Sequence, residues 1–331
     1  MFLTVIIPHY NNVALLGRCL QSLSAAGLGD GLQVVVVDDG SSPGQHEQFD
    51  ALIRQTDSLS IQPVYNTVNR GASAARNRGL LSAKGRFVWF VDADDEVDSG
   101  VLRQWWPRLE AVDERVELIH LGPMVRWNSG RVGASLRPGE THNDHGQVEN
   151  ATLADIITPR SHCLDHTTYW ISRKFLSRNP DIRYLETVSI LEDSVFVLRL
   201  LDQTRHVAMA HDCRLYIRHD EAHSVTSGAW SKEKSAGFVP DILFFFTQLF
   251  GFMDRHEELT HVVDLYHRYA YVYMRVLAVK GVPDSLYRSM FYNPVVRYGF
   301  IPRNVKERLL KNTMIHAFIS FACRVLRHSH E

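Results

Sequence analysis

The sequence predicts an α/β fold in which a mostly parallel central sheet carries helices on both faces. Strand-like and helix-like segments alternate through the first 120 residues, and the strands are apolar at nearly every position. Strands that are apolar throughout are buried on both faces, as in parallel sheets covered by helices. The length of 331 residues allows one large domain or two smaller ones.

Each element follows from a local pattern. Runs of β-branched and aromatic residues bounded by turn residues predict strands, and apolar residues three and four apart predict helices. The strands are expected at 4–7, 33–37, 61–65 and 86–91. The helices are expected at 14–23, from Pro43 onward, and at 71–83. Serines before Pro43 supply a cap for an N1 proline, and the third helix is rich in alanine, the best helix former.

Polar residues follow all four predicted strands. They are 8–11 (Pro-His-Tyr-Asn), 38–41 (Asp-Asp-Gly-Ser), the segment after Tyr65, and 92–95 (Asp-Ala-Asp-Asp). The carboxyl ends of parallel strands meet at one edge of a sheet, where ligands bind in this class of fold. We therefore expect a binding site at that edge.

The acidic run Asp92-Ala-Asp94-Asp95 is the strongest chemical signal. Three carboxylates at the end of a buried strand repel one another and lose hydration, so they add nothing to stability. A divalent cation makes them favourable, since hard cations bind carboxylate oxygens and usually share phosphate oxygens. The run therefore suggests a metal that holds a diphosphate, with a plain acidic turn as the alternative.

Composition excludes several classes of protein. The net charge is −1, so nucleic acid is not an expected partner. The four cysteines form no CxxC pair, which argues against a zinc ribbon or a disulfide framework and fits a reducing compartment. No basic segment marks a signal peptide, and no apolar run reaches the roughly 18 residues that span a bilayer. We expect a cytoplasmic protein.

Other site motifs do not fit. The glycines at 27–31 lack the GxGxxG spacing and follow a helix, and neither GxxxxGK[ST] nor GxSxG occurs. The Asp38-Asp39 pair is also typical of a response-regulator receiver, but a receiver explains neither the acids at 92–95 nor the rest of the chain.

Six segments together resemble the motifs of family 2 glycosyltransferases. Four occur in order: 5–11 (VIIPHYN), 37–42 (VDDGSS), 69–79 (NRGASAARNRG) and 90–95 (FVDADD). Two more, 191–196 (LEDSVF) and 216–219 (YIRH), resemble the family's later Glu-Asp and Tyr-x-Arg segments. The resemblance implies a GT-A, Rossmann-like catalytic domain at 1–228, with a nucleotide-binding half at about 1–120 and an acceptor half at about 121–228.

The resemblance also implies a reaction. It is an inverting transfer of a hexosyl or N-acetylhexosaminyl group from a nucleotide-sugar, with a UDP-sugar favoured. The acceptor would be a hydroxyl of a glycan or lipid-linked glycan, such as a bacterial surface polysaccharide. Mn²⁺ or Mg²⁺ would neutralise the charge that grows on the leaving diphosphate.

The resemblance also assigns roles to the residues of this sequence that match the family's motifs. Those implied to bind the nucleotide-sugar are Pro8, Tyr10, Asp38, Asp39, Asn69, Arg76, Asn77, Asp92 and Ala93. Asp39 would accept a hydrogen bond from an N–H of the base or a hydroxyl of the ribose. A base that lacks this donor would leave the buried carboxylate unpaired and would be rejected. One of Asp38 and Asp39 is also expected to cap the serine turn that follows. Arg76 offers a fork of donors for a phosphate or a base carbonyl, and Tyr10 is expected to stack on the base.

The remaining roles concern the metal and the acceptor. Asp94 is implied to bind the metal, with His219 as a further ligand. Asp193, at the start of a helix, is implied to be the general base that takes the acceptor proton, and an ordinary helix cap is the alternative. Acceptor contacts are expected from His162, Trp170 and Glu192.

Two histidine-containing spacings remain, His162-Cys163-x-Asp165-His166 and His219-x₃-His223. Both are compatible with a metal site. A structural zinc site would use more cysteine and closer pairing, so we do not assign one.

The region 229–331 is expected to be helical, with helices at 238–253, 262–279 and 304–327. Residues 297–331 hold seven Lys/Arg and two Glu, a net charge of +5, around an apolar helical face. Such a face can lie on the anionic inner surface of the plasma membrane or meet a lipid-linked acceptor. The alternative is packing on the catalytic domain or in a homodimer.

Two other functions agree with parts of the sequence. A sugar-1-phosphate nucleotidyltransferase shares the sheet type, but its glycine-rich phosphate loop is missing after the first strand. A non-catalytic glycan-binding or scaffold protein with a relict site is disfavoured, because all the acids that the chemistry needs are present.

Overall fold

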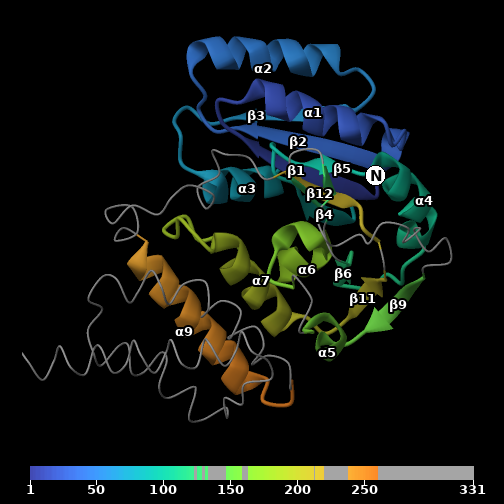
Figure 1. Cartoon of the computed structure of the whole chain (residues 1–331), viewed down its shortest axis with the longest axis vertical. Coiled ribbons are helices and arrows are strands. Elements are labelled where there is room, and N and C mark those ends of the chain that lie inside the picture. The colour runs from blue at the N-terminus through green and yellow to red at the C-terminus, as the bar shows by residue number, and fades with distance from the viewer. Residues whose placement is uncertain are drawn as a thin grey trace, which may run out of the picture.

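A computed structural model describes most of the chain up to residue 259 (Figure 1). The described residues are 1–122, 125–128, 131–132, 147–158, 163–211, 213–219 and 238–259. The helices expected at 262–279 and 304–327, with their proposed membrane or dimer contact, lie outside these residues.

An eight-stranded sheet forms the centre of the described structure, in the order β3-β2-β1-β4-β10-β6-β11-β9. Its strands are β1 (Leu3–His9), β2 (Leu32–Asp38), β3 (Ser60–Tyr65), β4 (Phe87–Phe90), β6 (Leu118–His120), β9 (Val148–Ala151), β10 (Tyr169–Ser172) and β11 (Val207–Ala210). The four strands β3, β2, β1 and β4 are parallel, and so are β6 and β11. β10 runs antiparallel between β4 and β6, and β9 is antiparallel to β11. The predicted mostly parallel sheet is confirmed.

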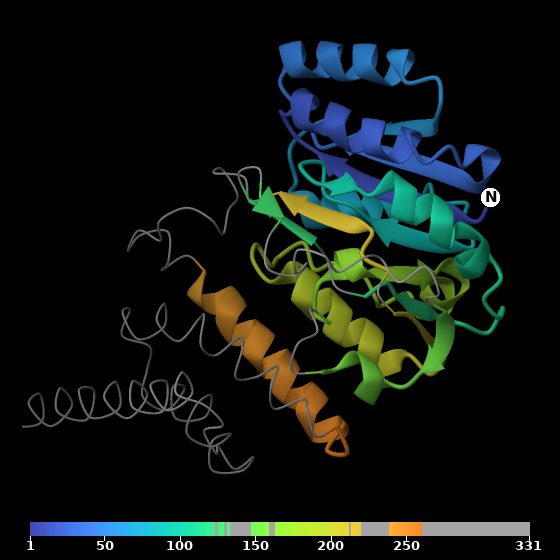
Figure 2. The same ribbon diagram turned by 45° about the vertical axis from the view of Figure 1, so that its right-hand side comes forward.

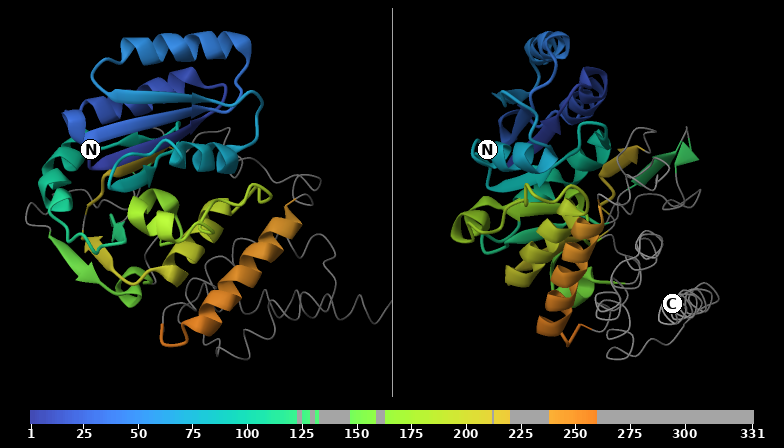
Figure 3. Two further views of the ribbon diagram at one scale, coloured as in Figure 1. Left: turned by 180° about the vertical axis from the view of Figure 1, so that it is seen from behind. Right: turned by 90° about the vertical axis from the view of Figure 1, so that its left-hand side faces the viewer.

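Helices cover both faces of this sheet, as predicted (Figure 3). Val5 and Ile7 of β1 face α1 (Val13–Ser24), α2 (Pro43–Gln55) and α4 (Ser99–Glu110). Ile6, between them, faces the cluster built by α3 (Ala72–Leu80), α6 (Arg173–Arg178) and α7 (Glu192–Gln203). Alternate residues of a strand point to opposite faces, so an entirely apolar strand fills both cores.

A second, four-stranded sheet stands at the carboxyl edge of the first. Its order is β5-β12-β7-β8, with β5 (Glu96–Val97), β12 (Tyr216–His219), β7 (Val125–Asn128) and β8 (Arg131–Val132). β12 pairs with β5 directly after the acidic run 92–95. This pairing brings the late Tyr-x-Arg segment to the acids. Short helices complete the described elements: η1 (Gly29–Gly31), α5 (Leu153–Ile156) and η2 (His166–Thr168).

Helix α9 (Val239–Arg255) packs against α7 (Figure 2). It agrees with the helix expected at 238–253. Its buried side chains, Ile242, Phe245, Phe246 and Leu249, belong to the same core cluster as those of α7. Within the described residues, none of the helices combines the length and apolar character that crossing a membrane requires.

Helix α3 lies very close to the sheet at Gly79. A Cβ atom there would stand 2.4 Å from Ile6 Cγ2 and 3.3 Å from Val37 Cγ2. No real Cβ contact is that short, so the helix or the strand would have to move. Glycine is therefore required for the distance between α3 and β1, and α3 carries several residues of the site.

We predict that Gly79→Ala lowers the free energy of unfolding by about 1–3 kcal/mol, the usual cost of overpacking a core. Gly44→Ala is the matched control, since Gly44 lies in α2 with no atom within 4 Å of an added Cβ. That change should be neutral or slightly stabilising, because alanine favours helices. Urea denaturation of both variants measures the difference, and equal stabilities would contradict the close approach.

Candidate active site

The loops after β1 and β2 are joined to each other at the carboxyl edge of the sheet. The Asn11 N–H donates to Ser41 Oγ at 2.9 Å, and the Ser42 N–H donates to Asn11 Oδ1 at 2.8 Å. Asn11 has φ of 54°, a left-handed conformation that asparagine tolerates better than most residues. The predicted convergence of these polar loops at one edge is present in the structure.

The neighbouring acids Asp38 and Asp39 perform different structural tasks. Asp38 Oδ1 accepts from the Ser41 N–H at 3.2 Å, so Asp38 is the acid that holds the serine turn. Asp39 Oδ2 accepts from the Gly71 N–H at 2.7 Å, and Asp39 Oδ1 accepts from Asn66 Nδ2 at 2.7 Å. Asp39 therefore fixes the loop that leads into α3.

The three acids after β4 form one cluster. One carboxylate oxygen from each of Asp92, Asp94 and Asp95 lies within 4.8 Å of the others. Asp95 is buried and accepts from the Tyr216 hydroxyl at 2.7 Å and from the His219 N–H at 2.8 Å. Burial, together with the negative charges of Asp92 and Asp94, raises the pKa of Asp95 to about 8. Such crowded, all-oxygen donors fit a hard cation, Mg²⁺ or Mn²⁺.

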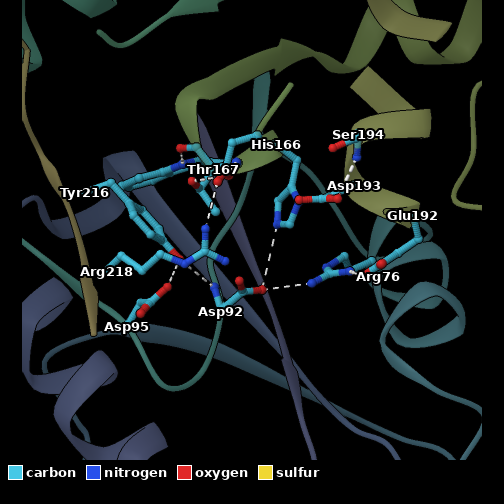
Figure 4. A network of polar contacts seen from close by, with 12 residues as sticks. Arg76, Asp92, Asp95, His166, Thr167, Glu192, Asp193, Ser194, Tyr216 and Arg218 are labelled. Carbon is cyan, nitrogen blue, oxygen red and sulfur yellow. Dashed lines mark hydrogen bonds and ion pairs between the residues drawn. The ribbon is translucent and has the colours of Figure 1, made fainter. Parts of the chain in front are cut away.

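Arg76 of α3 joins this cluster to the start of α7 (Figure 4). Its Nη2 donates to Asp92 Oδ1 at 2.8 Å and its Nη1 donates to Glu192 Oε1 at 3.1 Å. The guanidinium is buried and its Cζ lies 5.1 Å from the centroid of the Tyr184 ring. Burial opposes ionisation of Asp92, yet the Arg76 charge holds the pKa of Asp92 well below its usual range. In this structure the predicted fork of donors holds two carboxylates, and its contact with a phosphate or base carbonyl stays a prediction.

Asp193 lies in the first turn of α7, as predicted. The helix starts after Leu191, whose φ of 60° is unusual for a branched residue and sets the direction of the turn. Burial and the charges of Glu192 and Asp165 raise the pKa of Asp193 to about 6, although His166 and the Ser194 N–H oppose the rise. A carboxyl with this pKa can accept a proton near neutral pH.

The other predicted nucleotide-binding residues lie near this edge in different environments. Tyr10 follows β1 and is 49% exposed, as a stacking residue requires. Asn69 is exposed and accepts from the Gly71 N–H at 3.0 Å. Asn77 instead clamps the backbone of Tyr184 through both atoms of its amide, at 2.9 and 3.0 Å. Pro8 pairs with Val37 inside the sheet, and Ala93 lies in the turn after β4.

One predicted contact needs correction. Trp170, expected at the acceptor, is completely buried in β10 and packs on Trp89, Phe2 and Trp106. The ring of His219 lies against Glu96, with Nε2 3.0 Å from Oε1, and the His219 N–H donates to Asp95. The role of His219 as a metal ligand stays a prediction. His162 lies outside the described residues.

Tyr216 and His166 were not assigned roles from the sequence. Tyr216 donates to Asp95 and its hydroxyl also accepts from the Asp92 N–H at 3.2 Å. His166 is buried between Asp92 and Asp193 (Figure 4). The sequence signal for His166 is its spacing within His162-Cys163-x-Asp165-His166, directly before a buried strand.

Comparison with known proteins is consistent with this geometry. Residues 4–120 match the family model described as Glycosyl transferase family 2. This segment of the chain is similar to family 2 glycosyltransferases. The predicted family is thereby confirmed, and the matched segment includes the acids at 38–39 and 92–95.

Two solved structures share the fold. TarS 1-349 of S. aureus in complex with UDP-GlcNAc superposes with a TM-score of 0.63 at 20% identity, covering 90% of this chain and 80% of TarS 1-349. The mannosyltransferase PcManGT of Pyrobaculum calidifontis, in complex with GDP-Man and Mn²⁺, gives 0.55 at 16% identity, covering 98% and 86%. The expected GT-A fold is confirmed.

A relative by sequence is the minor teichoic acid biosynthesis protein GgaB of Bacillus subtilis (strain 168), 24% identical over 257 residues. The alignment covers 77% of this chain and 27% of GgaB. The chain spans between 27% and 62% of the length of the first three curated relatives that it matches.

We predict that Arg76→Ala lowers the free energy of unfolding by about 3–5 kcal/mol, because Asp92 and Glu192 are left without their cation. Arg70→Ala is the control: the Arg70–Glu186 pair has a similar length, 2.8 Å, but both side chains are exposed. Its loss should cost at most about 1 kcal/mol. Urea denaturation distinguishes the two, and a small loss in both would show that the buried bridge is not needed for stability.

Proposed function

We propose that this chain is an inverting transferase that moves a hexosyl or N-acetylhexosaminyl group from a UDP-sugar to a hydroxyl of a glycan or lipid-linked acceptor. The observation that carries the proposal is the position of Asp193. It lies across Arg76 and His166 from the acidic cluster at the sheet edge. This position supports a proton acceptor on an element that faces a diphosphate-binding edge.

The donor side is proposed from the first three polar loops. Tyr10 is exposed at the end of β1, and Asp39 fixes the loop that presents Asn69. TarS binds UDP-GlcNAc and PcManGT binds GDP-Man, so the shared fold is compatible with either base. UDP is our choice, as the TarS fragment has the higher TM-score.

The proposed metal residue is Asp94, within the cluster that also contains Asp92 and Asp95. Burial, together with the negative charges of Asp92 and Asp94, raises the pKa of Asp95, and a divalent cation would offset that charge. When bound, Mn²⁺ or Mg²⁺ supplies charge neutralisation for the departing diphosphate. Arg76 holds Asp92 in place within this acidic cluster, and Tyr216 holds Asp95.

The proposed role of Asp193 is to take the proton from the acceptor hydroxyl as that oxygen attacks the anomeric carbon opposite the diphosphate. Glu192 stays bound to Arg76, which keeps the first turn of α7 in position. The name of GgaB suggests a teichoic acid among the acceptors, within the class of bacterial surface glycans. Contact of the C-terminal region with a membrane or a second copy remains part of the proposal.

We predict that UDP binds in calorimetric titration with Mn²⁺ present and that EDTA weakens the binding. GDP and dTDP are the controls for the base. Asp94→Ala should remove the metal dependence, because it deletes a carboxylate oxygen that hard cations require. Metal-independent binding of UDP in the wild type would contradict the assignment of Asp94, and stronger binding of GDP would change the donor.

We predict an acid limb near pH 6 in the pH profile of kcat/KM. Asp193 must be ionised to accept a proton, and its pKa is raised to about 6, so activity is full above that pH and falls below it. Asp193→Asn should lower kcat by about 10²–10⁴-fold. Asp202→Asn, on the same helix but paired with Arg255, is the control and should leave the limb in place. Unchanged turnover in Asp193→Asn would refute the role of the base.

A further inference from the structure

A second group of ligand-type side chains lies beside the acidic cluster: Asp165, His166 and Asp193. One ligand atom from each lies within 4.8 Å of the others. Asp165 and His166 come from the turn that forms η2. Asp193 comes from the first turn of α7, and Figure 4 shows it beside His166. The group therefore bridges two elements that are separate in the sequence.

The imidazole of His166 lacks hydrogen-bond partners. It is 3% exposed, and neither ring nitrogen makes a hydrogen bond within the described part of the chain. Its Nε2 lies 3.7 Å from Asp92 Oδ1, beyond hydrogen-bond length. The rings of Phe90 and Tyr184 hold it edge-on, with centroids at 6.0 and 5.8 Å. A buried polar ring in this state costs free energy, which a bound ligand would recover.

Asp165 is oriented by its own set of donors. Its Oδ1 accepts from the N–H and the hydroxyl of Thr167 at 3.0 and 2.6 Å, and its Oδ2 accepts from Arg218 Nη1 at 3.0 Å. Such outer contacts are typical of carboxylates that bind metals. Two arginines, Arg218 and Arg76, face a larger number of carboxylates here: Asp92, Asp165, Glu192 and Asp193. The surroundings therefore retain negative charge.

We propose that Asp165, His166 and Asp193 form a second cation site, for an imidazole-preferring divalent ion of the zinc class. One nitrogen and two carboxylate oxygens supply three protein ligands, the number in open zinc sites, and all are donor atoms that zinc accepts. The acidic cluster at 92–95 offers only oxygen ligands and therefore favours harder ions. An ion in the second site occupies the carboxylate of Asp193. On the proposed function, that ion inhibits transfer because the base is no longer available.

Zinc binding by the full chain tests the site without any need for turnover. Zn²⁺ is titrated calorimetrically into untagged protein with no nucleotide present. The wild type should bind one equivalent more than His166→Ala and His166→Phe; the phenyl ring keeps the packing against Phe90 and Tyr184 but offers no nitrogen. His211→Ala, an exposed histidine near Glu149, is the matched control and should bind as the wild type does.

Two further variants separate the two cation sites. Asp94→Ala should keep the His166-dependent equivalent of zinc, and Asp193→Asn should lose it. Equal zinc stoichiometry in the wild type and in His166→Phe would overturn the proposal. So would loss of the equivalent in Asp94→Ala, because the ion would then belong to the acidic cluster.

Inhibition is measured in the transfer reaction with Mg²⁺ in fixed excess. Zn²⁺ should inhibit the wild type, and half-inhibition of His166→Phe should require at least about 10-fold more zinc, each relative to its own zinc-free rate. Equal sensitivity would overturn the inhibitory role. If the zinc-free wild type shows no transfer, the proposed function is contradicted. The result of the zinc-binding experiment does not depend on that outcome.

Discussion

The buried guanidinium of Arg76 is the interaction on which the site depends. It lies between a carboxylate after β4 and a carboxylate on α7, elements that are about a hundred residues apart in the chain. Away from water, each of these charges would be costly alone, so the three groups must stay together. Helix α3, brought close to the sheet by Gly79, sets where the guanidinium lies. The helix that carries Asp193 is therefore placed by electrostatics as well as by its apolar core.

Acids of one chemical type acquire different properties in this network. Asp92, beside Arg76, has a lowered pKa, while burial and neighbouring negative charges raise the pKa of Asp193 and of Asp95. A lowered pKa suits a permanent anion that organises cations, and a raised pKa suits a group that exchanges protons. Surroundings, and not residue type, separate these roles.

Sequence patterns predicted the elements of the first 95 residues well, because entirely apolar strands and capped helices are local signals. They also placed Asp193 at a helix start. The partners of Arg76 could not be predicted, since a salt bridge across 116 residues leaves no local trace. The burial of Trp170 could not be predicted either, because an aromatic residue in the sequence is compatible with a surface or a core position. Its burial depends on where β10 inserts in the sheet. For His166, the sequence offered only a spacing compatible with a metal site.

The antiparallel strand β10 lies between β4 and β6, although it follows both in the chain. β6 pairs with β10 and β11 and with no earlier strand of the sheet, so residues 118–120 join the sheet only through later ones. A growing polypeptide that ends near residue 120 would leave the edge of β4 unpaired and open to other chains. Residues 1–120 therefore do not complete the sheet without later strands. During synthesis, β4 and β6 can be joined only after β10, which ends at Ser172, has left the ribosome.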